Sequence, residues 1–568
     1  MRLTTAKVGE VSERTPSAID AIADTYTSRL AELNPLEATF MGIAGHDHQM
    51  SDFSPQGLAE VAQLDRDTLT ALAAAVPVDD TDRVTLAAMR DRLGLGVEIY
   101  EAGELFADLN VIASPLQNLR DVLDLMPTAT VDDWANIAAR TRLIPDAVRG
   151  YIASLREGVH RGVVPAQRQV DECIKQAAEL ADPSSSFFVT FAAGASPDGT
   201  AAVGGLANDL ALAGRNAASA YGDLVDFLSD ELAGVAPVAD AVGRERYALH
   251  SRGFVGAEVD LDETYAWGLD ELERMAAEQQ EIIEQLAGPG ATMADAVKVL
   301  DNDPALTLQG TEALKEWMQT TADAAIAALD GTHFDIPAQL HTIECLIAPT
   351  ENGGIYYTGP SDDFSRPGRM WWSVPPGVTK FATWREKTTV YHEGVPGHHL
   401  QIAQAVLVRD QLNSWRRLVS WSSGHGEGWA LYAERLMEEF GFMEHPGDRL
   451  GLVDGQRMRA ARVVVDIGVH CGLPAPARWG GGIWDADKAW ELLKANVNMD
   501  ESFLRFELNR YLGWPGQAPS YKIGQRLWEQ ARAEAQTKAG ASFDLKAWHT
   551  KALNLGSVPL AILPEALA

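Results

Sequence analysis

The segment from Tyr391 to Gln401, with the sequence YHEGVPGHHLQ, constrains this chain more than any other stretch. Three of the thirteen histidines and one glutamate fall between His392 and His399. The residues on either side have the spacing of apolar side chains that is typical of helices. A core helix has no packing reason to concentrate imidazoles and a carboxylate in this way, so the segment indicates a chemical site.

The order of these residues approaches a known metal-binding pattern. In the zinc-peptidase signature H-E-x-x-H, two histidines at i and i+4 bind the metal from one helix face, and the glutamate activates water. Position i+4 from His392 is Pro396, so the plain motif is absent. On a straight helix, His398 would lie about 240° round the axis from His392, and His399 would lie roughly 10 Å along it. Neither would reach the same ion as His392.

An interruption of the helix would solve this problem. Gly394, Pro396 and Gly397 permit one, because proline removes a helical hydrogen bond and glycine adopts dihedral angles closed to other residues. We therefore predict an H-E-x-x-H helix with two residues inserted. His392 and His398 are the predicted zinc ligands, and Glu393 is the predicted general base. His399 is expected to support the site or bind substrate, although the sequence leaves open which of His398 and His399 is the ligand.

A third protein ligand is expected, since catalytic zinc keeps three and leaves the fourth position to water. The stretch from residue 422 to 435, SSGHGEGWALYAER, is a glycine-rich loop that opens an amphipathic helix. Glu427, at the start of that helix, is the predicted third ligand, with one Zn²⁺ per chain. Glu434 lies two turns further along the same face and His425 is close by, so either could replace Glu427.

Four strings, HEGVPGHHLQ, GEGWALYAERL, RAARVVVDIGVH and RYLGWPGQAPSYKIG, resemble the bacterial domain of unknown function 885 family over nearly the full chain. Through the metal helix and its partner, that family is remotely similar to the helical zinc peptidases that include angiotensin-converting enzyme, neurolysin and Taq-type carboxypeptidase. The resemblance implies a mainly α, two-lobed fold with a deep channel and a small β-sheet near the active site. It also implies an oligopeptidase or carboxypeptidase that cleaves short peptides.

The resemblance implies roles for further residues. In the helix predicted around residues 457–470, Arg459, Arg462, Asp466 and His470 form one polar stripe, which a salt-bridged surface would also explain. The resemblance implies that this stripe faces the channel. Arg462 would then hold a substrate carboxylate or a site glutamate, and His470 would donate a hydrogen bond to substrate.

The related peptidases also use a downstream tyrosine to stabilise the oxyanion of the transition state. The resemblance implies Tyr521 for this role, with Tyr511 as the alternative, in a loop that opens a helix near the C-terminus. A buried structural tyrosine remains the other explanation for each. Lys522 is a candidate for binding a C-terminal carboxylate, although a lysine in a loop is more often solvated.

Secondary structure predicted from apolar spacing is helical over most of the chain, with loops at 36–55 and 183–200. Three short β-branched or aromatic runs, 341–347, 354–358 and 370–374, predict a small sheet. The resemblance implies that an edge strand pairs with the substrate backbone, with Tyr357 as a substrate-binding residue; a packing hairpin is the alternative. The predicted helices cover residues 17–33, 56–75, 81–103, 131–158, 165–182, 201–233, 238–250, 260–286 and 308–329.

The chain shows no internal repeat or clear linker, which favours a single domain over residues 1–568. We expect an N-terminal helical lobe to about residue 330 and a metal-site region over 340–568. The net charge of -33, from 80 acidic and 47 basic residues, argues against nucleic-acid and membrane partners.

Other features of the sequence bear on where the protein is located and on its function class. The three cysteines are widely spaced, the N-terminus is polar, and no run of about 18 apolar residues occurs, so we expect a cytoplasmic protein. The sequence does not indicate an oligomeric state. Two other functions stay open: a zinc hydrolase of a non-peptide amide or ester, and a non-catalytic metal-binding scaffold.

Overall fold

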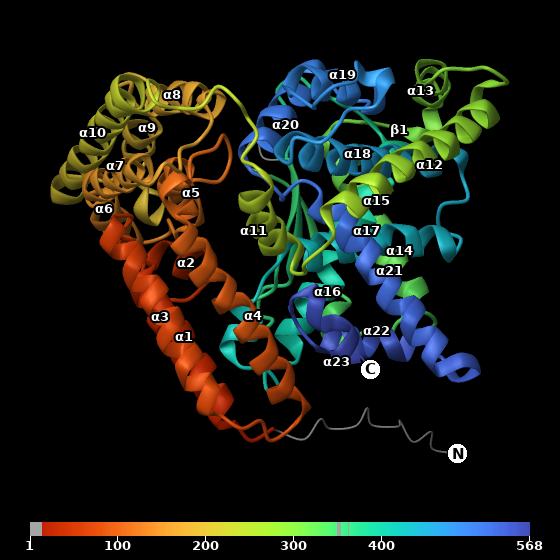
Figure 1. The fold of residues 1–568 in the computed structure, drawn as a ribbon, viewed down its shortest axis with the longest axis horizontal. Helices are drawn as coiled ribbons and strands as arrows, with labels where there is room; N and C mark the ends of the chain where they lie inside the picture. Colours follow the sequence, from red (N-terminus) through yellow and green to blue (C-terminus); the bar gives the residue numbers. More distant parts are fainter. Residues whose placement is uncertain (1–13, 349–353, 362, 568) are drawn as a thin grey trace.

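The computed structural model describes residues 14–348, 354–361 and 363–567. This part of the chain is mainly helical, with two small sheets (Figure 1). All three cysteines are free. None of the helices in the described ranges combines the length and the apolar character needed to cross a membrane.

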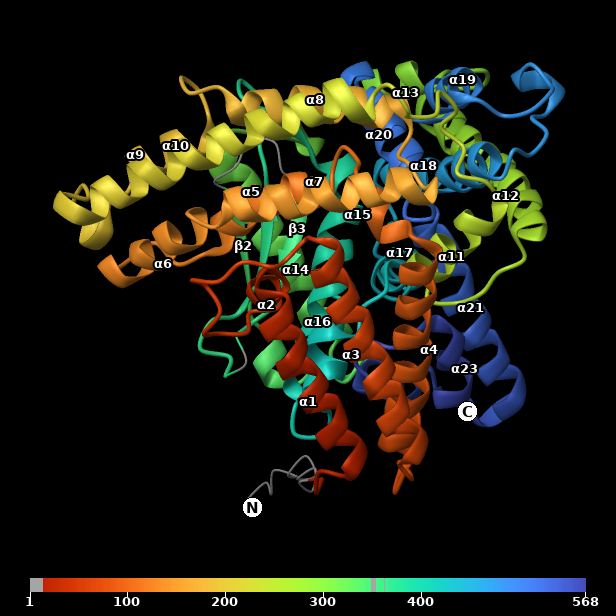
Figure 2. The ribbon, with the colours of Figure 1, turned by 60° about the vertical axis from the view of Figure 1, so that its left-hand side comes forward.

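The first ten helices form one unit, here called the N-terminal part (residues 14–236). Its main apolar core includes the buried rings of Trp134, Tyr151, Phe188 and Tyr221. Figure 2 shows α7, α8 and α10 running across the ends of α1, α3 and α4. The helices are α1 (Ala18–Leu33), α2 (Pro35–Phe40), α3 (Pro55–Ala74), α4 (Asp80–Ala102), α5 (Pro115–Leu125), α6 (Val131–Thr141), α7 (Ile144–Arg161), α8 (Gln167–Ala181), α9 (Phe187–Ala193) and α10 (Gly204–Phe227).

The remaining helices and all the strands form the C-terminal part (residues 244–567), which lies beside the N-terminal part in Figure 1 with α11 near the junction. Its helices are α11 (Arg244–Val255), α12 (Leu261–Ala287), α13 (Met293–Asp301), α14 (Thr311–Leu329), α15 (Thr383–Glu393), α16 (His398–Leu407), α17 (Ser423–Glu439), α18 (Pro446–His470), α19 (Ala486–Asn496), α20 (Glu501–Gly513), α21 (Ser520–Ala539), α22 (Leu545–Asn554) and α23 (Leu563–Leu567).

Helix α18 is the centre of the C-terminal part. Val463, Val464, Val465 and Ile467 are completely buried, and α12, α15, α19, α20 and α21 all pack against this helix. The polar side chains of Arg462, Asp466 and His470 on the same helix are buried as well. Neighbouring helices therefore cover α18 on every side, and several helices that carry site residues gather around it.

The predicted small sheet is present. Strands β2 (Ile343–Ile347), β4 (Gly368–Trp372) and β3 (Ile355–Thr358) lie in that order, with β2 parallel and β3 antiparallel to β4. A second, unpredicted pair joins β1 (Thr307–Gln309) to β5 (Lys380–Ala382). Because β5 runs directly into α15, this pair fixes where the helix with His392 begins.

Several predicted boundaries were wrong. The predicted helix at 131–158 is two helices, since Pro145 stands in the first turn of α7 and favours a new helix start. The predicted loops at 36–55 and 183–200 contain α2 and α9. The apolar core of the C-terminal part already includes Tyr247, so the change between the two parts comes well before residue 330.

Candidate metal centre

The predicted break in the metal helix is confirmed. Helix α15 ends at Glu393 and α16 begins at His398. The connection is so tight that a Cβ atom on Gly397 would lie 2.0 Å from the carbonyl oxygen of His392. A Cβ atom on Gly394 would lie 2.5 Å from the carbonyl oxygen of Val390. Only glycine fits at these two positions, and the resulting turn brings the His392 and His398 rings to 4.8 Å between centroids.

The structure brings together the three residues predicted as ligands. Glu427 Oε2 lies 3.3 Å from His392 Nε2 and 3.6 Å from His398 Nε2. Donor atoms of all three residues lie within 4.8 Å of one another. Tetrahedral zinc with bonds of about 2.0–2.1 Å separates its donors by about 3.3–3.4 Å. The donor types, and the 3.3 and 3.6 Å spacings from Glu427 to the two histidines, suit a divalent metal ion such as zinc.

Glu434 lies behind His392. Its Oε1 is 2.8 Å from His392 Nδ1, and its other oxygen accepts a hydrogen bond of 2.9 Å from Thr388 Oγ1. This contact turns the His392 Nε2 atom toward Glu427. A carboxylate on the second nitrogen is the usual partner of a metal-binding histidine, so the geometry gives Glu434 an orienting position. Burial lowers the pKa of His392, but the Glu427 and Glu434 carboxylates outweigh it and raise that pKa to about 10.

Among the described residues, His398 has no orienting partner of the kind that Glu434 provides for His392. Its Nδ1 atom is buried and has no hydrogen-bond partner among the described residues. Its Nε2 atom faces Glu427. Burial raises the pKa of Glu427, yet the two histidines hold it well below its usual range. His392, His398 and Glu427 thus converge on one point.

Glu393 is the last residue of α15 and is buried. Burial raises the pKa of its carboxyl, and the nearby His392 and His398 partly offset the rise. A carboxyl with a raised pKa beside the donor set has the properties of a general base, because it exchanges protons nearer to neutral pH.

His399 makes two hydrogen bonds away from the three donors. Its Nε2 donates to the carbonyl oxygen of Leu340 at 3.0 Å, so its Nδ1 accepts from the Tyr357 hydroxyl at 2.9 Å. Burial lowers the pKa of His399 to about 4, so the ring is neutral. His399 and Tyr357 therefore join α16 to strand β3 and to the chain before β2.

Tyr521 stands in the first turn of α21, beyond the loop in which it was predicted. The guanidinium carbon of Arg462 is 5.1 Å from the centre of its ring. Burial and then the carboxylate of Glu427 raise the pKa of Tyr521 to about 12. Its hydroxyl makes no hydrogen bond to any described residue, which leaves it available beside Glu427.

A close contact between α17 and α21 sets the positions of Glu427 and Tyr521. A Cβ atom on Gly428 would lie 2.4 Å from the backbone of Gly524, and one on Gly524 would lie 2.2 Å from the carbonyl oxygen of Gly424. The two helices therefore touch through their backbones. Glu427 directly precedes one contact glycine, and Tyr521 lies one turn before the other.

Arg462 and Tyr511 belong to a neighbouring ionic network. Arg462 Nε donates to the Tyr511 hydroxyl at 2.7 Å, and its Nη2 donates to Glu507 at 2.9 Å. Tyr511 also donates to Glu507. Arg462 is thus held by Glu507 and contacts no donor of the candidate metal centre by hydrogen bond within the described ranges. That Arg462 holds a substrate carboxylate or a site glutamate stays a prediction.

The structure does not bring His470 or Lys522 to the centre. His470 has no exposed surface, and its Nε2 donates to the carbonyl oxygen of Tyr511 at 3.0 Å. Lys522 lies in α21 and is buried, with its Nζ 2.9 Å from Glu271. The expectation of a loop lysine was wrong, because helix α21 begins at Ser520.

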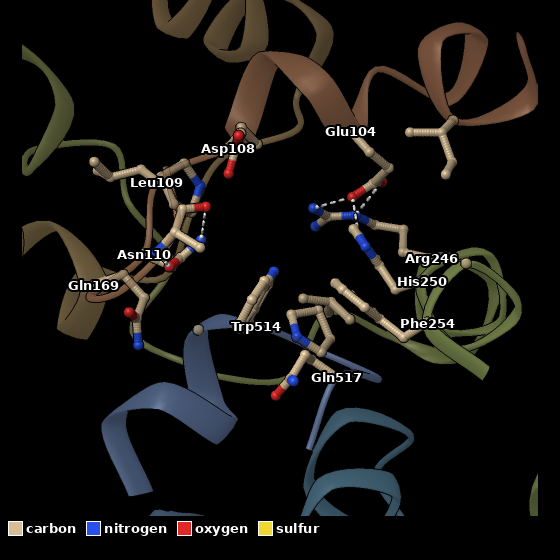
Figure 3. A pocket seen from close by; sticks show the side chains of 18 of the residues that line it. Glu104, Asp108, Leu109, Asn110, Gln169, Arg246, His250, Phe254, Trp514 and Gln517 are labelled. Atoms are coloured by element: carbon tan, nitrogen blue, oxygen red, sulfur yellow. Dashed lines mark hydrogen bonds and ion pairs between the residues drawn. The ribbon is translucent and has the colours of Figure 1, made fainter. Parts of the chain in front are cut away.

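A cavity of about 580 Å³ lies between the N-terminal and C-terminal parts, and Glu427 is part of its lining (Figure 3). Residues Trp421 to Ser423 line it beside Glu427, and Trp514 lines it from the end of α20. The rest of the lining comes mainly from α4, from residues 104–113 and from α11. No motif in the sequence marks these lining residues, which lie more than one hundred positions before His392.

The comparisons with known proteins agree with this fold. The family model described as "Bacterial protein of unknown function (DUF885)" matches residues 35–567. No curated protein matches the chain. A solved structure of a "putative lipoprotein" from Colwellia psychrerythraea is similar, with a TM-score of 0.81 and 22% identity over 97% of this chain and 98% of that one. A second, described as a "putative lipoprotein of unknown function" from Shewanella oneidensis, has a TM-score of 0.74 and 15% identity over 97% of this chain and 99% of that one. The chain belongs to the DUF885 family.

Proposed function

We propose that this protein is a zinc-dependent hydrolase that cleaves peptide bonds in short peptides, as an oligopeptidase or carboxypeptidase. The observation that carries the proposal is the convergence of His392, His398 and Glu427 beside Glu393, at a cavity that Glu427 lines. The two-lobed zinc-peptidase fold and the cytoplasmic location remain predictions. The similar solved structures named above come from proteins described as "putative lipoprotein".

The residues have separable tasks in this proposal. His392, His398 and Glu427 hold the ion, and Glu434 fixes the ring of His392 through Nδ1. Zinc in such a site acidifies water and polarises the scissile carbonyl. Glu393 takes the proton from the attacking water on its carboxylate and passes it to the leaving amine.

Tyr521 completes the site. Its unpaired hydroxyl donates to the oxyanion that develops on the substrate, and the ring against Arg462 keeps this hydroxyl in place. The cavity of about 580 Å³ has the size of small-molecule pockets, which suits short peptides and excludes folded proteins.

The test combines metal content with peptide cleavage. We expect about one zinc per wild-type chain by mass spectrometry, lost in His392→Ala, His398→Ala and Glu427→Ala together with cleavage of a peptide library. Glu393→Gln should keep the zinc but lower the rate by about 10²–10⁴. Zinc with cleavage of only amide or ester compounds would assign the site to another substrate. A wild-type protein that takes up no zinc would refute the proposal.

A further inference from the structure

Asp108 is a carboxylate without a partner in the wall of the interlobe cavity, defined here as the cavity lined by Glu427. It directly follows the short helical turn Glu104–Ala107. No N–H or O–H group of the described residues donates to its side chain, and no described cation pairs with it. In Figure 3 its carboxylate points from the wall into the cavity, on the side opposite Trp514. Burial raises its pKa to about 7.

The other acidic residues of this wall are paired. Glu104 accepts two hydrogen bonds from Arg246, at 2.7 and 2.9 Å, and lies 2.8 Å from His250 Nε2 (Figure 3). Asp240 accepts from Arg168 at 2.9 and 3.3 Å. Asp108 is therefore the carboxyl group in this wall that has no partner among the described residues, and a cation that enters the cavity would favour its ionised form.

The chain around Asp108 is held in place. Its carbonyl oxygen accepts a hydrogen bond of 2.6 Å from the Tyr151 hydroxyl. Asn110 Oδ1 accepts from the backbone N–H groups of Ile112 and Ala113, at 3.0 and 2.8 Å. Binding a ligand there requires little ordering of the loop, because the backbone around Asp108 is already held by hydrogen bonds.

The opposite wall is aromatic. Trp514 packs edge-on against Phe254, with 5.3 Å between ring centroids and 81° between planes. Both rings line the interlobe cavity. An indole face attracts cations, most strongly where water is partly excluded. The net charge of -33 also raises the local concentration of cationic ligands near the protein.

We propose that Asp108 and Trp514 form a subsite for a positively charged nitrogen of the peptide substrate. This deepens the proposed function and rests on it only for the identity of the substrate as a peptide. Two sources supply the same chemistry: the N-terminal ammonium of the peptide, or a lysine or arginine side chain. The nitrogen sits between the Asp108 carboxylate and the Trp514 ring, with the scissile bond toward Glu427.

Three related probes separate the two sources. N-acetyl-lysinamide carries only the side-chain cation, norleucinamide carries only the terminal ammonium, and N-acetyl-norleucinamide carries neither. Calorimetry on the full chain should show one of the two cationic probes binding at least about 10-fold more tightly than the neutral one. The cationic probe that binds more tightly identifies the source of the charge. Equal binding of all three would overturn the subsite.

Variants then assign the preference to its residues. Asp108→Asn keeps the shape of the side chain and should reduce binding of the cationic probe to the level of the neutral one. Asp240→Asn is the matched control, because it removes the same charge from the same wall where Arg168 already pairs with it. A preference that survives Asp108→Asn, or that Asp240→Asn removes equally, overturns the proposal. Trp514→Leu should weaken binding of the cationic probe by about 2- to 5-fold. This variant tests the subsite if Asp108→Asn does not fold.

Probe binding does not depend on hydrolysis, so the hydrolase proposal and the subsite proposal can be refuted independently of each other. Glu393→Gln should leave the binding of all three probes unchanged while peptide cleavage is lost. A cation preference in a protein without zinc or cleavage would support the subsite and refute the hydrolase. Peptide cleavage without any preference for the cationic probes would support the hydrolase and refute the subsite.

Discussion

At the scale of single residues, the structure gives different positions to two glutamates that the sequence left as alternatives. Glu427 faces Nε2 of both histidines, whereas Glu434 contacts only Nδ1 of His392. We predict that Glu434→Gln lowers zinc affinity by about 10- to 100-fold but keeps one zinc per chain, as loss of an orienting partner does. Glu427→Gln should abolish stoichiometric binding.

Competition with a chelator of known affinity measures both constants. Thr388→Val is the matched control, since it removes the second hydrogen bond of Glu434 while leaving its contact with His392 intact. If Glu434→Gln loses all zinc while Glu427→Gln retains it, the two carboxylates have exchanged roles.

The neighbouring histidines give a second prediction. His399→Asn should leave zinc content unchanged and lower the free energy of unfolding by about 1–3 kcal/mol, because it disturbs buried hydrogen bonds to Tyr357 and Leu340. His398→Asn should lose the zinc. Metal analysis and denaturant unfolding of the two variants test this pair. Zinc lost from His399→Asn alone would make His399 the ligand.

Much of this site was predictable from residue spacing. The break at Gly394 and Gly397 followed from where those residues stand in the motif, and it brings His392 and His398 together as expected. Spacing could not say which groups the other ring nitrogens of His392 and His399 contact. That depends on partners such as Leu340 and Glu434, which come from other elements.

At the scale of elements, the contact between α17 and α21 controls the centre. Gly524→Ala should lower the free energy of unfolding by about 1–3 kcal/mol, because its Cβ atom would overlap the backbone of Gly424. It should also weaken zinc binding by moving Glu427 on α17. Gly222→Ala in α10 is the control: its Cβ atom would meet nothing within 4 Å, so that variant should gain about 0.4–1 kcal/mol.

Denaturant unfolding with zinc titration measures both effects. If Gly524→Ala is as stable as the wild type, the two helices have room to separate, and the glycine contact does not position the centre. The comparison with Gly222→Ala separates overlap at the crossing from the general benefit of replacing a helical glycine.

Apolar spacing predicted the long helices because their buried faces repeat over many turns, as in α3, α4 and α12. It missed α9, which has only seven residues and was assigned to a loop on its serine and glycine content. It also missed the β1–β5 pair, whose strands have three residues each and lie far apart in the chain. Elements this short carry too few residues to show a period.

At the scale of the whole molecule, the interlobe cavity was beyond prediction. Its walls join Asp108, Trp514 and Glu427, and only the packing of the N-terminal part against the C-terminal part brings these residues to one space. A carboxylate after a short turn has nothing unusual in the sequence. Its lack of a partner became visible only when the surrounding cations were seen to pair elsewhere.

The whole fold should also be sensitive to acid through buried neutral histidines. His549 is completely buried, and its Nε2 accepts from the Tyr432 hydroxyl at 2.9 Å. Burial lowers its pKa to about 3, against about 6.5 in an unfolded chain. Below pH 6.5 the unfolded chain binds a proton that the folded protein does not, so stability falls as pH decreases toward 3.

The contribution of His549 is measured as a difference between two proteins. Between pH 7.5 and pH 5.0, the free energy of unfolding of the wild type should fall by about 2 kcal/mol more than that of His549→Gln. Glutamine still offers an acceptor to Tyr432 but does not titrate, and every other group cancels in the difference. Denaturant unfolding at the two pH values measures it. An equal fall in both proteins would mean that His549 gains its proton as readily in the folded state as in the unfolded chain. Burial of this α22 side chain would then not keep its ring neutral.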